Sequence, residues 1–178
     1  MNAVIKELKA YPYSSQDIMN ICEGKTKILT YQELQKFKTI DGALKPYDNF
    51  VLLYEMKPNF GHWVCVIKHK NPKYKGGAKI EFFDPYGYGI DKQFKFINKN
   101  FNGNGNRLKL SELLVNSPYK IVENKKKIQK LKEGVNSCGR HVGFRINMRD
   151  MELDDFVKFV SSGSMNADDT ITYLTAFN

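Results

Sequence analysis

A histidine and an aspartate stand at the ends of two apolar segments, where they can form part of a catalytic group. His62 begins the segment HWVCVIK and Asp84 ends the segment KIEFFD. If these segments pair as antiparallel strands with residue 62 opposite 84, then 64 lies opposite 82 and 66 opposite 80. Opposed residues share a face with Cβ atoms ~4.5–5.5 Å apart, so Asp84 can hold the His62 imidazole in one tautomer. The plainer alternative is a surface histidine near a surface aspartate.

A cysteine further along the chain has surroundings that favour a thiolate. Asn136 and Ser137 are residue types that cap helices, so we expect Cys138 in the first turn of a helix. The helix dipole and unpaired N–H groups there favour a thiolate, which beside a histidine is an activated nucleophile. Gly139 permits close backbone approach by a substrate. The alternative is a buried structural cysteine, the usual fate of a free thiol.

The other cysteines fit packing better than chemistry. Cys65 lies between two valines in a strand candidate, and Cys22 lies late in a short apolar helix. Zinc is the rival chemistry, because Cys138 and His141 have helical i, i+3 spacing and His62 or Cys65 would have to complete the set. Zinc sites usually show two close ligand pairs, and only one such pair is present here. We therefore expect no metal and no cofactor.

The elements that must position these residues indicate an α+β fold in a single domain over residues 1–178. Strands are expected at residues 50–56, 62–68 and 79–84, and the last two form a hairpin with a long exposed loop. A short strand is also expected at 119–123. A capping box of Thr30 and Glu33 predicts that a helix begins there. Further helices are expected at 15–23, 91–100, 111–115, 138–150, 153–161 and 168–176.

Composition and charge restrict the setting. No apolar stretch approaches the ~20 residues of a membrane span, and residues 1–10 lack the apolar run of a signal peptide. The three widely spaced cysteines argue against a disulfide framework. We therefore expect a protein that is neither membrane-bound nor secreted and that stays in a reducing compartment.

Three short strings, in this order, resemble a known family of cysteine proteases. They are Gly-His-Trp at 61–63, Phe-Asp-Pro-Tyr-Gly at 83–87 and Cys-Gly at 138–139. Together they resemble the adenoviral protease (adenain) and the SUMO-specific proteases, over about residues 50–150. The string Ser-Cys-Gly-Arg-His is similar to proteases of virophages, Polinton-type elements and large DNA viruses. The resemblance implies a papain-like, adenain-type α+β fold, with a mixed or antiparallel central sheet flanked by helices and the nucleophile at a helix N-terminus.

The resemblance also implies a role for each matching residue. Cys138 would attack the scissile carbonyl, His62 would act as general base and then acid, and Asp84 would orient His62. The Cys138 backbone N–H would form part of the oxyanion hole, with Gln129 as the candidate side-chain donor. Gln129 lies nine residues before the cysteine, farther than in the family, and the alternative is a solvent-facing residue of a basic helix. Trp63 matches a tryptophan that roofs a narrow substrate tunnel, or is a core aromatic.

The implied function is a viral maturation protease that cleaves capsid or core precursors after Gly-Gly-like or Gly-Xaa sequences. Its setting would be the virion and the host-cell cytoplasm. A protease of the same fold that removes ubiquitin-like modifiers is the alternative within the family.

Charge suggests an alternative of another class, a basic nucleic-acid-binding protein without catalysis. The net charge is +9, and lysines gather at Lys68, Lys70, Lys73 and Lys75 and again over residues 125–132. These lysines can hold phosphates without sequence preference or merely solubilise a surface.

Overall fold

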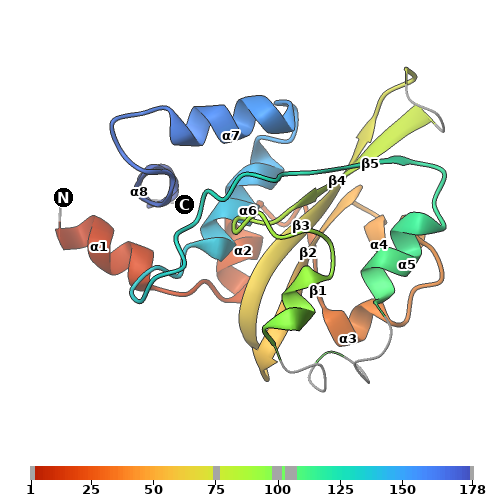
Figure 1. The fold of residues 1–178 in the computed structure, drawn as a ribbon, viewed down its shortest axis with the longest axis horizontal. Coiled ribbons are helices and arrows are strands. Elements are labelled where there is room, and N and C mark those ends of the chain that lie inside the picture. Colours follow the sequence, from red (N-terminus) through yellow and green to blue (C-terminus); the bar gives the residue numbers. More distant parts are fainter. Residues whose placement is uncertain (1–2, 74–76, 98–101, 103–107, 177–178) are drawn as a thin grey trace.

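A five-stranded mixed sheet is the centre of the fold (Figure 1), in a computed structural model that describes residues 3–73, 77–97, 102 and 108–176. The central strands β2, β3 and β4 run antiparallel, and the edge strands β1 and β5 pair in parallel with β2 and β4. The strands, in sheet order, are β1 (Lys27–Thr30), β2 (Asn49–Lys57), β3 (Phe60–Lys70), β4 (Ala78–Phe83) and β5 (Lys120–Glu123). This arrangement confirms the expected α+β class and the expected hairpin.

The register of that hairpin differs from the expected one. Cys65 pairs with Phe83 and Val66 with Phe82, so continuing the ladder sets residue 64, not 62, level with residue 84. The expected register is therefore wrong by two residues. A shift of two preserves the face that each side chain occupies, because side chains alternate along a strand. His62 and Asp84 consequently stay on one face, as diagonal rather than opposed neighbours.

Helices cover both faces of the sheet, so both faces of the strands are apolar (Figure 1). In β2, for example, Val51 and Leu53 belong to one core, and Phe50 and Leu52 to the other. The first core includes α2 (Ser15–Ile21), α6 (Cys138–Asn147), α7 (Leu153–Ser161) and α8 (Ala167–Leu174); the second includes α3 (Tyr31–Leu34), α4 (Ile40–Leu44) and α5 (Lys109–Val115). The helix that begins at Cys138 therefore packs on the first face.

Most expected helices are present, and the capping box of Thr30 and Glu33 forms. The prediction of a helix at 91–100 is wrong for the residues that the structure describes, which form only a 3-10 turn, η2 (Lys92–Lys95). Residues 98–100 lie outside the described residues. Asp91 precedes this turn with φ 59°, and its carboxylate accepts the hydroxyls of Tyr31 and Tyr54. Tertiary contacts thus override the local helical tendency.

Three elements were not expected, namely β1, α4 and α1 (Ala3–Ala10), which packs beside α8. Within the described ranges, none of the helices has both the length and the apolar character needed to cross a membrane.

Candidate active site

The His62 imidazole is bound to a carboxylate that is itself fixed from several directions. His62 Nε2 and Asp84 Oδ1 are 2.7 Å apart, and both side chains are buried. Asp84 also accepts the backbone N–H of Tyr86 at 2.8 Å and the side-chain amide of Gln93. Asn124, next to β5, binds both backbone groups of Asp84. The carboxylate is therefore held in place to orient the imidazole.

The same imidazole lies beside the side chain of Cys138, the first residue of α6, and both residues line one groove. Burial alone lowers the pKa of His62, but the charge and hydrogen bond of Asp84, together with Cys138, raise it to about 10. A histidine protonated at neutral pH beside a cysteine can donate its proton to the leaving group when that cysteine attacks a substrate. Cys138 is partly exposed, whereas Cys22 and Cys65 are buried. The structure thus brings together the three residues proposed as a triad.

The start of α6 differs from the expected capping. Ser137 occupies the N-cap position, but its hydroxyl donates to Asp168 Oδ1 at 2.6 Å instead of capping the helix. The Asn136 side chain donates to the Ala10 carbonyl at 2.7 Å. Cys138 lies in the first turn of α6, as expected, but neither side chain caps the helix, because tertiary partners take both. The N–H groups of the first turn are consequently left without a side-chain cap, where they favour an anion.

Gln129 is buried beside this group with both side-chain polar atoms unpaired. It is 1% exposed, and neither its Nε2 nor its Oε1 has a hydrogen-bond partner in the described structure. Its backbone N–H donates to Pro85 O, directly after Asp84, at 2.9 Å. The solvent-facing alternative is therefore wrong, and the segment is not helical. An unpaired buried amide costs ~1–3 kcal/mol, and its amide group is available to a substrate atom.

A groove of about 410 Å³ opens where His62, Gln129 and Cys138 meet. Tyr86 also lines it and stacks on the His62 ring. The rest of the wall is largely apolar and includes the exposed side chains of Met56, Phe60, Phe96 and Leu131. The groove thus places the Cys138 side chain at a largely apolar surface.

Neither Trp63 nor Gly139 lines that groove. Trp63 is buried, and its Nε1 donates to the Tyr13 carbonyl at 3.0 Å. It lines a much smaller pocket of about 40 Å³ together with Cys138. A Cβ at Gly139 would lie 2.5 Å from the Tyr13 Cβ, so glycine is required there for packing. Substrate contact by either residue remains a prediction.

The residue pair that suggested zinc does not converge. His141 turns toward α8, with its Nε2 3.2 Å from Asp168 Oδ1, and Cys65 lies in the core. In the part of the chain that the structure describes, no group of three His, Cys, Asp or Glu residues is placed to hold a metal.

Sequence reasoning missed several residues that build the site. Tyr86 lies in the Phe-Asp-Pro-Tyr-Gly string, so its place beside the triad had a signal. Gly87 ends that string with φ 70°, and a Cβ there would lie 3.0 Å from the backbone of residues 125–127. Asn124 and Gln93 had no signal, because the parallel β4–β5 pairing and the turn after Asp91 bring them in.

Comparisons with known proteins agree with this architecture. No protein-family model matches the chain. The selenomethionine form of the ASFV pS273R protease matches with a TM-score of 0.52 over 95% of this chain and 68% of that one, at 15% identity. The fold is thus similar to that of the ASFV pS273R protease. Uncharacterized protein V9 of Sputnik virophage is 34% identical over 180 residues, which span 96% of this chain and 99% of V9. The chain therefore belongs to the same family as virophage V9.

Proposed function

We propose that the chain is a cysteine endopeptidase that cleaves viral capsid or core precursor proteins during virion maturation. One observation carries the proposal: His62 joins Asp84 and Cys138 at the edge of an apolar groove. The virophage relative supports a viral setting, which we take to be the virion and the cytoplasmic virus factory.

The geometry supports a thioester mechanism. The Cys138 thiolate attacks the scissile carbonyl carbon, and the developing oxyanion accepts from the Cys138 backbone N–H and from Gln129 Nε2. His62 gives its proton to the leaving amine as the C–N bond breaks, leaving an acyl thioester on Cys138. The neutral His62, oriented by Asp84, then takes a proton from water. That water attacks the thioester and releases the acid product and the free cysteine.

Small residues, as in Gly-Gly or Gly-Xaa, are proposed at the two positions before the cut. The family resemblance suggests this preference, and the pocket between Trp63 and Cys138 supports it. Its volume is about 40 Å³, against about 410 Å³ for the groove beside His62 and Cys138. The smaller pocket favours a small side chain there.

A peptide-library assay tests both the activity and the preference. We expect cleavage after glycine by the wild-type chain and none by Cys138→Ala. A profile with large or charged residues immediately before the cut would contradict the preference. Cleavage restricted to ubiquitin-like fusions would favour the deconjugating alternative. Inertness toward a thiol-directed substrate probe would favour the non-enzymatic one.

Sequence-independent nucleic-acid contact is a separate proposal. Lys68 and Lys70 form ion pairs with Asp41 and Asp48, at 2.6 and 2.7 Å, and Lys75 lies outside the described residues. The exposed lysines at 125–127, 130 and 132 therefore give the stronger support.

A further inference from the structure

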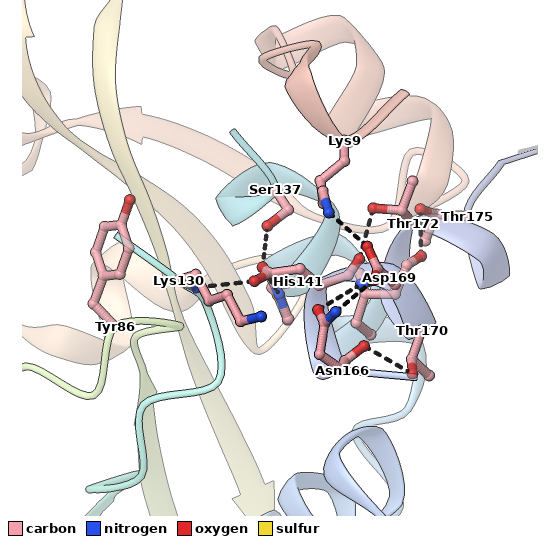
Figure 2. A network of polar contacts seen from close by, with 12 residues as sticks. Lys9, Tyr86, Lys130, Ser137, His141, Asn166, Asp169, Thr170, Thr172 and Thr175 are labelled. Atoms are coloured by element: carbon pink, nitrogen blue, oxygen red, sulfur yellow. Dashed lines mark hydrogen bonds and ion pairs between the residues drawn. The ribbon is translucent and has the colours of Figure 1, made fainter. Parts of the chain in front are cut away.

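One carboxylate of α8 binds both chain segments that carry the proposed oxyanion donors. Asp168 Oδ2 accepts the backbone N–H of Lys130 at 2.9 Å, and Oδ1 accepts the Ser137 hydroxyl at 2.6 Å. Lys130 directly follows Gln129, and Ser137 directly precedes Cys138. Figure 2 shows Lys130 and Ser137 meeting at this point from two separate segments.

The carboxylate is buried and charged. Asp168 is 1% exposed, and His141, on the next turn of α6, lies 3.2 Å from the same Oδ1. Burial raises the pKa of Asp168, but hydrogen bonds from His141, Ser137 and Lys130 outweigh it and lower the pKa overall. Removing this group leaves the backbone N–H of Lys130 without the acceptor of its part-buried hydrogen bond, which is costly.

The segment that carries Gln129 depends on such individual contacts for its shape. Between β5 and α6 the chain forms neither helix nor strand. On one side, the N–H groups of Ile128 and Gln129 donate to Pro85 O at 3.0 and 2.9 Å. On the other side, the next N–H, that of Lys130, donates to Asp168. Gln129 is therefore held between the turn that follows Asp84 and the first turn of α8.

We propose that Asp168 is a positioning residue that sets the distance between the Gln129 amide and the Cys138 N–H. It does not line the groove, so it acts on a substrate through these two residues. The catalytic part of this inference rests on the proposed protease function. The structural part, that Asp168 holds the Lys130 and Ser137 segments together, does not. Oxyanion donors act on charge that develops in the transition state, so misplacing them lowers kcat more than it changes KM.

Kinetics of Asp168→Ala and Asp168→Asn test the catalytic part. We expect Asp168→Ala to lower kcat by ~10²-fold per folded molecule, with KM changed by about twofold or less. Asp168→Asn retains an acceptor for one partner and should lose less. Asp169→Asn is the matched control, because the adjacent buried carboxylate pairs with Lys9 at 2.6 Å instead. Its kcat should stay near wild type.

Hydrogen exchange read by mass spectrometry tests the structural part of the proposal without any cleavage assay. Peptides spanning residues 128–138 should exchange faster in Asp168→Ala than in wild type, while β2 and β3 peptides stay unchanged. If the wild-type chain cleaves nothing, the proposed function fails, but the exchange result still shows whether Asp168 holds the two segments together. If Asp168→Ala does not fold, Asp168→Asn and Ser137→Ala carry the test. Unchanged exchange and unchanged kcat, or an equal loss in Asp169→Asn, would overturn the proposal.

Discussion

The Tyr86 ring lies flat against the His62 imidazole, with ring centroids 4.4 Å apart and ring planes at 23°. The Tyr86 N–H also donates to Asp84, so one residue contacts both partners of the buried pair. Tyr86 thus shields the bond between them from solvent.

Replacing Tyr86 tests this shield. Stacked aromatic pairs contribute ~0.5–1.5 kcal/mol, so we expect Tyr86→Ala to lower kcat/KM about 3- to 10-fold. Tyr86→Phe keeps the ring and the backbone N–H and should retain activity. An equal loss in both variants would assign the effect to the hydroxyl instead.

The three cysteines should differ sharply in reactivity. Burial raises the pKa of Cys22 to about 12 and that of Cys65 well above its usual range. We therefore expect iodoacetamide to label Cys138 first in the native protein, as read by mass spectrometry. Cys138→Ala should abolish cleavage, while Cys22→Ala and Cys65→Ala leave the chemistry intact. Rapid native labelling of either buried cysteine would count against the assignment.

The pH dependence of folding stability and of Cys138 alkylation should reveal the His62–Asp84 pair. His62 has a pKa of about 10 in the folded state, against ~6.5 in an unfolded chain. The charged imidazole therefore stabilises the fold below pH ~6.5, and this contribution is lost as the pH rises toward the folded value. Alkylation of Cys138 measured against pH should change when His62 loses its proton, near the His62 pKa of about 10. Asp84→Asn should move that transition to lower pH, because the charge that favours imidazolium is gone.

Rates should separate the two members of that pair. His62→Ala removes the general base and acid and should lower kcat by at least ~10²- to 10⁴-fold. Asp84→Asn should cost less, because the base survives without its enforced tautomer. A larger loss in Asp84→Asn would contradict these roles.

Gln129 should matter much more for activity than for stability. Removing one oxyanion donor costs ~10²- to 10³-fold in kcat, which we expect for Gln129→Ala. Neither polar atom of the Gln129 side chain has a hydrogen-bond partner in the described structure, so Gln129→Ala breaks no hydrogen bond. Its melting temperature should therefore fall only by the amount that the lost side-chain packing accounts for. Gln93→Ala is a useful contrast, since it removes a bond to Asp84 and should lower both quantities.

Nucleic-acid binding should depend on the second lysine cluster and on salt. Fluorescence anisotropy with a labelled duplex should show binding at ~50 mM salt that weakens steeply by ~200 mM, through counterion release. Replacing Lys125, Lys126 and Lys127 by alanine should weaken it more than Lys68→Ala, because Lys68 is paired with Asp41. No binding at the lower salt would remove the proposal, and salt-independent binding would exclude phosphate contact.

Local patterns predicted much of the fold and the site, and long-range contacts explain what they missed. The apolar β3 and β4 segments and the amphipathic α7 carry their own signals, and α7 lies where it was expected. Alternation has a period of two, so it could place His62 and Asp84 on one face but could not exclude a two-residue shift. The partners of Ser137 come from α8, about thirty residues later, and no local pattern reports them.

The proposed dependence of the oxyanion donors on α8 has a consequence for the timing of synthesis. His62, Asp84 and Cys138 all leave the ribosome before Asp168 does. On the proposed function, a nascent chain thus has its nucleophile and base before it has the group that sets Gln129 in place. Full proteolytic activity would arise only when α8 packs against the rest of the fold. The order of residues along the chain would therefore delay activity until after the catalytic segments are translated.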